Sequence, residues 1–221
     1  MGFYRGPHLV TDGLTFAIDA GSTRSYAGSG TTAYNLVANN DVSLINGLGW
    51  QSGNGGYFSS DGTDDGMTTP DATNLDLVTF TLEGWVWWDQ HKNYGSFLVK
   101  GPGGSGNLFN YTFFGYATTV SFGYGDGSNY RSTSISSPAI NEWHHIMGTY
   151  DGSTLKFYLN STLTSSTTTS ATPNQNNDAL QILQSQYSID GRIGCARVYN
   201  RALTAAEVLQ NYNAQKSRFG L

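Results

Sequence analysis

The sequence predicts an all-β protein, an antiparallel β-sandwich with one short C-terminal helix. Charged residues make up only 12% of the 221 residues, about half of the ~25% usual in globular domains, and the chain contains 28 glycines. This composition suits many short strands and turns rather than long helices. Hydrophobic residues at 38% and aromatic residues at 14% are enough to fill a core. A hairpin at residues 141–160 and a helix start near residue 204 complete the prediction.

The N-terminal residues 1–13 are polar and irregular, and we expect them to form an arm with Phe3, Tyr4 and Arg5 as its interface residues. No repeat, linker or shift of composition interrupts the rest of the chain, so residues 14–221 are expected to form a single domain.

Strands are predicted where apolar and polar residues alternate with a period of two. The clearest case is residues 80–88, which place Phe80 and Leu82 on one face and Glu83 and Trp85 on the other. Residues 20–34 are expected to be a Gly/Ser/Thr loop, and residues 161–178 fit an edge strand and a loop about equally well. The other strands are expected near residues 14–18, 42–45, 97–100, 110–116, 120–124, 130–132, 179–183 and 191–199.

The hairpin is the strongest local signal in the chain. Its first strand places Trp143 and His145 on one face and His144 on the other, before Asp151-Gly152 supplies a tight turn. Its second strand alternates Leu155, Phe157 and Leu159 with Lys156, Tyr158 and Asn160.

The helix start is a capping box, in which Thr204 and Glu207 each accept a hydrogen bond from the other's backbone N–H. It predicts a helix over about residues 205–213. We expect its apolar side to face the sandwich through Leu203, Val208, Leu209 and Tyr212.

Three segments together carry a family resemblance. They are FTLEGWVWWD at 80–89, the hairpin run from Trp143 to Tyr150-Asp151-Gly152, and DGRIGCARVYNRALTAAEV at 190–208. In order and spacing they resemble laminin-G-like, concanavalin-A-like jelly-roll domains. The resemblance implies that Trp85 and Trp143 pack between the two sheets.

Both ends of the chain extend the resemblance. The segment GLTFAIDAGSTRSYAGSGTTAYNLV and the ending NYNAQKSRFGL are similar to laminin-G-like proteins of tailed-phage virions, especially of phages that infect aquatic bacteria. This implies a virion structural or surface protein, such as a head decoration or fibre. Its expected partners are other virion chains, including copies of itself.

Catalysis is not expected. Glycosidases place two carboxylates ~5–10 Å apart, whereas Glu83 and Asp89 on one strand face would lie roughly 20 Å apart. His144 and His145 point to opposite faces and cannot share a metal. Cys195, the single cysteine, lies in an apolar strand and is expected to be a buried structural thiol.

Calcium is the candidate metal, because hard cations take oxygen ligands from flexible loops. The candidate ligands are Asp61, Asp64 and Asp65 in the loop DGTDDGM, and Asp12 or Asp19 near the first strand. Asp-Gly and Asp-Asp pairs are also ordinary turn chemistry. Many members of the resembled family place a metal-binding acid in the strand at 191–199, but Gly194 stands there in this chain.

Carbohydrate binding would need exposed aromatic rings with nearby polar groups. The main candidates are Tyr94, Asp126, Asn129 and Tyr130 in the loops 91–95 and 123–131. Trp87, Tyr116, Tyr124, Asn93 and Asn107 are further candidates.

The leading hypothesis is therefore a non-enzymatic virion structural protein with weak adhesion to host glycans. The alternative is a lectin module that acts mainly in glycan recognition. The net charge of −5 and the scattered Lys and Arg residues argue against nucleic-acid and anionic-membrane partners. The N-terminus shows no signal-peptide pattern, so synthesis in the bacterial cytoplasm and a location in the virion are expected.

Overall fold

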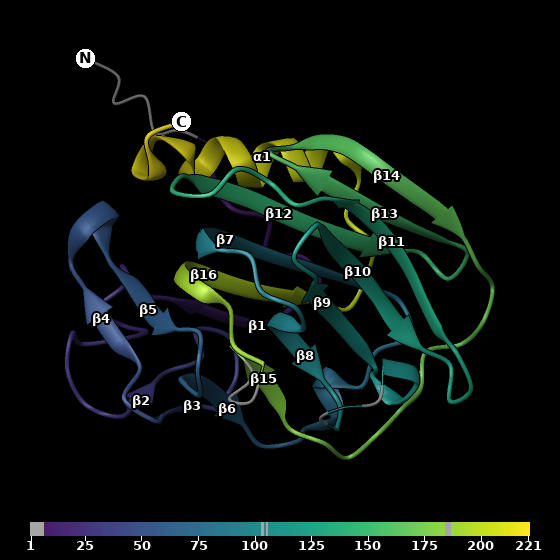
Figure 1. The fold of residues 1–221 in the computed structure, drawn as a ribbon, viewed down its shortest axis with the longest axis horizontal. Coiled ribbons are helices and arrows are strands. Elements are labelled where there is room, and N and C mark those ends of the chain that lie inside the picture. The colour runs from purple at the N-terminus through teal and green to yellow at the C-terminus, as the bar shows by residue number, and fades with distance from the viewer. Residues whose placement is uncertain (1–6, 103, 105, 184–186) are drawn as a thin grey trace.

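A computed structural model describes residues 7–102, 104, 106–183 and 187–221 as two antiparallel sheets packed face to face (Figure 1). Within these residues each sheet has eight strands. This confirms the predicted antiparallel β-sandwich.

Sheet A contains the predicted hairpin and the C-terminal strand. In order across the sheet its strands are β14 (Thr162–Thr168), β13 (Thr154–Leu159), β12 (Trp143–Tyr150), β7 (Phe80–Gln90), β16 (Asp190–Tyr199), β5 (Tyr57–Asp61) and β4 (Gly49–Gln51), with β1 (Leu14–Asp19) also paired to β16.

Sheet B carries the loops that matter for the candidate site. Its order is β11 (Tyr130–Ser136), β10 (Thr119–Gly125), β9 (Tyr111–Gly115), β8 (Gly95–Lys100), β15 (Leu180–Ile182), β6 (Gly66–Thr69), β3 (Val42–Ile45) and β2 (Thr32–Ala33). Three 3₁₀ turns, Gly53–Gly55, Thr73–Leu75 and Gly106–Leu108, lie in the connections.

The core between the sheets is rich in aromatic side chains. Phe80 of β7 lies 5.7 Å from Phe122 of β10 and 5.4 Å from Tyr111 of β9, measured between ring centroids. Phe113 contacts Phe157 across the sandwich at 5.4 Å. These rings are fully buried, and burial of such large apolar surfaces is the main force holding the two sheets together.

A third layer covers the face of sheet A that points away from sheet B (Figure 1). It consists of α1 (Ala205–Gln215) and the 3₁₀ helix η4 (Lys216–Phe219). The capping box of Thr204 and Glu207 is present, as predicted. Val208 is buried, but Leu209 is 47% exposed, so the prediction that it faces the sandwich is wrong.

Trp85 and Trp143 are buried in this third layer, not between the sheets as expected. The ring of Trp85 stacks on Phe219 at 4.3 Å, and Trp143 lies 4.8 Å from the same ring. The alternation of β7 explains this, because Phe80 and Leu82 already face the core between the sheets. Trp88, on the same face as Phe80, is the tryptophan that packs between the sheets.

The sequence pattern did not distinguish the short or polar strands from loops. β2 lies inside the predicted loop at 20–34, and β4 and β6 were not predicted. The Ser/Thr-rich run forms β14, an exposed edge strand, over its first part. Such strands bury few side chains, so they show little hydrophobic periodicity.

The described part of the N-terminal arm lies against α1. The backbone N–H of Val10 donates to Asn211 Oδ1 at 2.8 Å, and Gln210 Nε2 donates to the carbonyl of His8 at 2.7 Å. Phe3, Tyr4 and Arg5 lie outside the described residues. In the described part of the chain, no helix is both long and apolar enough to cross a membrane.

Candidate ligand-binding site

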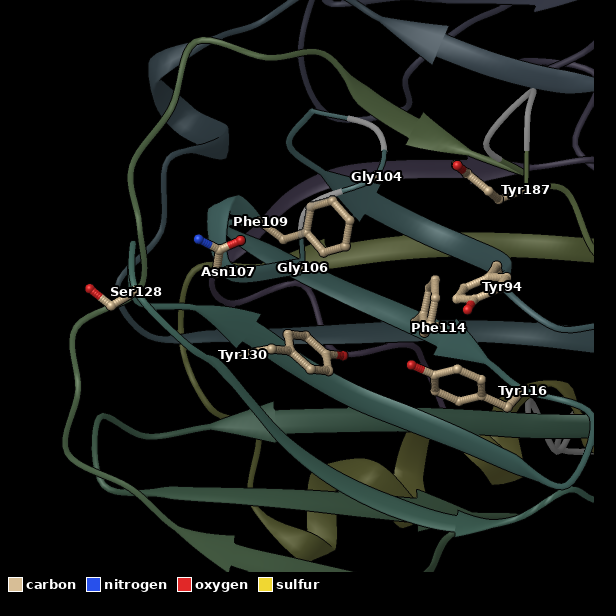
Figure 2. A pocket seen from close by; sticks show the side chains of 10 residues that line it. All are labelled: Tyr94, Gly104, Gly106, Asn107, Phe109, Phe114, Tyr116, Ser128, Tyr130 and Tyr187. Carbon is tan, nitrogen blue, oxygen red and sulfur yellow. The ribbon is translucent and has the colours of Figure 1, made fainter.

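An open cavity lies on the face of sheet B that points away from the core. It has a volume of about 730 Å³, and six of its ten lining residues are aromatic (Figure 2). It forms here because Phe113 turns into the core, which leaves the next residue of β9, Phe114, on the outer face. The lining residues are Tyr94, Gly104, Gly106, Asn107, Phe109, Phe114, Tyr116, Ser128, Tyr130 and Tyr187.

One end of the cavity is an aromatic cluster around Tyr94 (Figure 2). The ring centroid of Tyr94 lies 5.8 Å from Phe114, 5.6 Å from Tyr116 and 6.2 Å from Tyr187. Tyr94 is 52% exposed and has a φ of 66°, in the left-handed region that a bulky residue rarely adopts. Strained backbone of this kind concentrates at ligand-binding sites. The exposed ring offers a flat apolar surface for a ligand to stack on.

The loop that carries Tyr94 is tied to the neighbouring loop. Asn93 Oδ1 accepts a hydrogen bond from the backbone N–H of Ala117 at 3.1 Å, next to Tyr116. The backbone N–H of Ser96 donates to the carbonyl of Tyr187. The three tyrosines therefore come from three segments that backbone and side-chain hydrogen bonds hold together.

The other end of the cavity is formed by Phe109, Asn107 and Tyr130 (Figure 2). Gly106 lies against the Tyr130 ring, since a Cβ at this glycine would be 3.4 Å from a ring carbon. The Tyr130 hydroxyl is buried and has no hydrogen-bond partner among the described residues. Burial raises the pKa of Tyr130 well above its usual value, with a further contribution from Tyr116.

The hydroxyls of Tyr130 and Tyr116 point toward one another from opposite sides of the cavity (Figure 2). A buried hydroxyl without a partner loses the hydrogen bonds that water would give it. A ligand with a polar group between the two tyrosines would restore them.

Of the predicted glycan-binding residues, the structure brings Tyr94 and Tyr130 into this cavity, together with Tyr116 and Asn107. Phe109, Phe114 and Tyr187 were not selected from the sequence. An aromatic residue on a strand or beside a glycine does not show by itself which face it will occupy. Tyr124 is buried in the core, and Trp87 lies on the outer face of sheet A against Arg192.

Asp126 and Asn129 lie in the loop beside the cavity but do not line it. The Asp126 carboxylate accepts hydrogen bonds from the backbone N–H groups of Asn129 at 2.7 Å and Ser128 at 2.9 Å, and from Arg131 Nε at 2.7 Å. These hydrogen bonds, that of Asn129 first, lower the pKa of Asp126 to about 2. Its geometry is that of a residue that holds the loop 126–130 in shape.

The predicted metal ligands come together at the end of β5. Asp61, Asp64 and Asp65 each bring a carboxylate oxygen within 4.8 Å of the others. Asp65 is buried, and burial raises its pKa, with smaller contributions from the neighbouring charges of Asp61 and Asp64. Three carboxylates at this separation offer the hard oxygen ligands that calcium prefers.

Glu83, the acid weighed for catalysis, is completely buried beneath α1 and away from the cavity. Arg197 Nη1 donates to its Oε1 at 3.0 Å, and Asn211 Nδ2 donates to its Oε2 at 2.9 Å. The Tyr199 hydroxyl donates to the same Oε2 at 3.2 Å, and His145 Nε2 lies 3.1 Å from Oε1. Burial alone would raise the pKa of Glu83, but Arg197 and His145 outweigh it and lower the pKa to about 2.

Cys195 is buried in the same layer, as expected from its apolar strand. Burial raises the pKa of its thiol to about 12, so it is held as the unreactive thiol at neutral pH.

The two-sheet fold and the open aromatic cavity define a lectin-like β-sandwich. A model of the concanavalin A-like lectin/glucanases superfamily matches residues 61–209, and the chain belongs to this superfamily. No curated protein sequence matches the chain.

Solved structures with the same fold are distant in sequence. Trypanosoma rangeli sialidase, solved with sialic acid, superposes with a TM-score of 0.71 at 15% identity over 96% of this chain and 35% of the sialidase. The botulinum neurotoxin serotype D binding domain gives 0.73 at 12% identity, over 92% of this chain and 52% of that one. This chain thus spans about a third of the sialidase and about half of the toxin domain.

A third structure matches over nearly its whole length. It is domain 4 of an extracellular arabinanase from Geobacillus stearothermophilus, solved in complex with arabinotriose. Its TM-score is 0.67 at 15% identity, over 90% of this chain and 98% of the domain. At these identities the three likenesses establish the fold alone.

Proposed function

We propose that this chain is a non-enzymatic glycan-binding module and that the cavity beside Tyr94 and Tyr130 is its binding site. The observation that carries the proposal is that six aromatic side chains line one open cavity, and that the hydroxyls of Tyr116 and Tyr130 point toward one another there. The C–H faces of a sugar ring stack on exposed aromatic rings, while its hydroxyls need donors and acceptors such as Tyr and Asn. Tyr94 supplies the stacking surface, and Tyr116, Tyr130 and Asn107 supply the polar groups.

The neighbouring structures support the proposal by analogy. One was solved with sialic acid and another with arabinotriose, and a botulinum neurotoxin binding domain was solved in complex with SialylT. Each of these ligands belongs to its own protein. The arabinotriose complex is the most direct of these analogies, because this chain covers 98% of that domain, whereas it covers 35% of the sialidase and 52% of the toxin domain.

The non-enzymatic part of the proposal rests on where the acids lie. The described lining of the cavity contains no Asp or Glu. Glu83 is sealed beneath α1, and Asp126 is occupied by its own loop. The paired carboxylates that glycosidases use are therefore not assembled around this cavity.

The biological setting that we propose is the surface of a tailed-phage virion, where the module would adhere weakly to host glycans. Its support is the resemblance of both terminal segments to laminin-G-like virion proteins. In this setting the partners are other virion chains, including copies of itself, contacted through the arm with Phe3, Tyr4 and Arg5.

A glycan array followed by calorimetry tests the binding proposal. We expect Tyr94→Ala to weaken binding of the best array glycan at least tenfold through loss of the stacking surface. Tyr130→Phe should weaken it about fivefold, because one hydrogen bond is worth ~1 kcal/mol. The matched control is Tyr34→Ala, since Tyr34 is 51% exposed but lies outside the cavity. The proposal fails if no glycan binds, or if Tyr94→Ala and Tyr34→Ala bind alike.

Light scattering tests the virion-subunit proposal. Deleting residues 1–6 spares His8 and Val10, which contact α1, so the fold of the sandwich should be kept. We expect the full chain to form a closed oligomer and the truncated chain to be a monomer. A monomer in both forms would count against an assembly role for the arm.

A further inference from the structure

A second cavity lies next to the proposed glycan site. It has a volume of about 580 Å³ and shares Tyr130 with the first cavity. Its other lining residues come from β11, from the end of β14 and from the segment that follows β14. They are Arg131, Ser132, Thr167, Thr168, Thr169, Ser170 and Ala171.

From this arrangement we infer that the ligand is a linear oligosaccharide that extends across both cavities. The inference rests on the proposed glycan function and adds the length and direction of the bound chain. One end of the oligosaccharide stacks in the aromatic cavity, the chain passes Tyr130, and its other end lies among the hydroxyls of the second cavity.

The loop 126–130 connects the two cavities. Ser128 lines the first, Arg131 lines the second, and Tyr130 lines both. Asp126 fixes this loop by binding two of its backbone N–H groups and Arg131 Nε. The border between the cavities is therefore preformed, which lowers the entropic cost of binding an extended ligand.

The far wall of the second cavity is also held in place by the core. The Tyr150 hydroxyl donates to the carbonyl of Ala171 at 2.9 Å, and the Tyr124 hydroxyl lies 3.3 Å from Thr169 Oγ1. Nearby, Thr133 Oγ1 and Ser165 Oγ are 2.8 Å apart and join β11 to β14. Two buried tyrosines thus anchor a surface segment that would otherwise be a free polar loop.

The two cavities offer different groups, and a sugar chain uses both kinds, because its C–H faces stack on aromatic rings and its hydroxyls form hydrogen bonds. The first offers aromatic rings, whereas the second offers hydroxyls and one guanidinium. Within the described residues, the hydroxyls of Ser132, Thr167, Thr168 and Ser170 make no hydrogen bond to the protein, in contrast to Thr169. Such groups can bind ligand hydroxyls without breaking any internal hydrogen bond.

Size favours a chain over a single sugar. Each cavity alone falls within the ~300–1,000 Å³ typical of a small-molecule site. A monosaccharide bound in the first cavity would leave the second cavity empty. A compact ligand could not contact both cavities, because Tyr130 lies between them. The net charge of −5 disfavours a densely anionic polymer, so a neutral or sparsely charged chain fits best.

The test is a chain-length series measured by calorimetry on the full chain. The probes are linear oligomers of one, three and six units from arabinan, xylan, chitin and β-1,4-glucan. The variant Ser132→Ala/Thr168→Val removes two hydroxyls from the second cavity while leaving the first intact. The control variant, Thr162→Val/Ser166→Ala, makes the same kinds of change on β14 outside the cavity.

We expect the affinity of at least one series to rise tenfold or more from one unit to six. The Ser132→Ala/Thr168→Val variant should lose most of this gain and keep the affinity for the single unit, whereas the control variant should behave like the natural protein. If a single unit binds as tightly as six, or if both variants bind six units equally well, the inference is wrong while the glycan proposal stands. If the natural protein binds a glycan on the array but none of these oligomers at any length, the inference is wrong, and if it binds no glycan at all, both are wrong.

Discussion

Two regions of the molecule bring aspartates together. At the end of β8 the aspartates surround a lysine, whereas in the loop after β5 they pair with no Lys or Arg among the described residues. Lys100 is completely buried, and its Nζ lies 2.7 Å from Asp71 Oδ1 and 3.1 Å from Asp76 Oδ1. It also donates to the carbonyls of Asn176 at 2.9 Å and Asp178 at 2.8 Å. We call this arrangement the Lys100 cage. Its ammonium group is surrounded by carboxylate and carbonyl oxygens, as a metal ion is in a metal-binding loop.

The second region, the loop after β5, also brings aspartate carboxylates together, but no cationic side chain in the described part of the chain neutralises them there. Asp61, Asp64 and Asp65 face one another, and the pKa of Asp65 is raised by burial and by its neighbours. In the Lys100 cage, the chain itself supplies the cation, and this ammonium group joins residues 71–76 to residues 176–178. In the loop after β5 the three carboxylates come from neighbouring residues of one segment, and no Lys or Arg among the described residues forms an ion pair with them.

The largest expected effect is that of removing the internal cation. Lys100→Met keeps most of the side-chain volume but leaves Asp71 and Asp76 facing each other in a partly buried site. Because breaking a buried ion pair is costly, we expect the free energy of unfolding to fall by about 3 kcal/mol in urea denaturation.

Lys92→Met is the matched control for that variant. Lys92 Nζ lies 3.9 Å from Asp190 and its side chain is 34% exposed, so its loss should cost less than about 1 kcal/mol. Equal losses for the two variants would contradict the idea that Lys100 organises its loops.

The next effect concerns Glu83, where a buried anion is surrounded by donors, the reverse of the Lys100 cage. Glu83→Gln leaves the guanidinium of Arg197 without its closest carboxylate, and Asp19 is 3.6 Å from that side chain. We expect a loss of about 2 kcal/mol by thermal or urea unfolding.

The pH dependence of stability separates Glu83 from the other acids. Its pKa in the folded protein is about 2, below the usual 4.5, so its contribution is complete above pH 4.5 and is lost as the pH falls toward 2. Glu83→Gln should lack this part of the acid-induced loss of stability. Parallel pH profiles for the natural protein and the variant would show that another group is responsible.

The smallest effect is expected from calcium at Asp61, Asp64 and Asp65. If the site binds calcium with a Kd of ~10⁻⁴–10⁻³ M, as in extracellular modules, 5 mM calcium should stabilise the fold by about 1–2 kcal/mol. Asp65→Asn should abolish the gain, and magnesium should not reproduce it. A thermal midpoint that calcium leaves unchanged would show that this cluster is turn chemistry alone.

Without calcium, Asp65 should respond to pH in the direction opposite to Glu83. Its folded pKa is raised above the usual 3.8, so its ionised form opposes folding. Lowering the pH through the folded pKa toward 3.8 should therefore relieve this cost in the natural protein and have no such effect in Asp65→Asn, as measured by thermal unfolding in a metal chelator.

The sequence by itself determined the features that depend on near neighbours. The turn at Asp151-Gly152, the alternation of β7 and β12 and the capping box of Thr204 and Glu207 are all present as predicted. Each of these follows from a backbone preference or a side-chain period that acts within a few residues. The grouping of Asp61, Asp64 and Asp65 was predictable for the same reason.

Only the tertiary structure decided which elements cover which faces. The family resemblance predicted that Trp85 would be buried, but it placed the ring between the sheets and not beneath α1 and η4. Tyr94 and Tyr130 were selected separately, yet their shared cavity also needs Phe109 and Tyr187 from two other segments. The Lys100 cage draws its oxygens from residues 71–76 and 176–178. Contacts between segments so far apart depend on how the two sheets pack and pair, and local sequence preferences do not encode that arrangement.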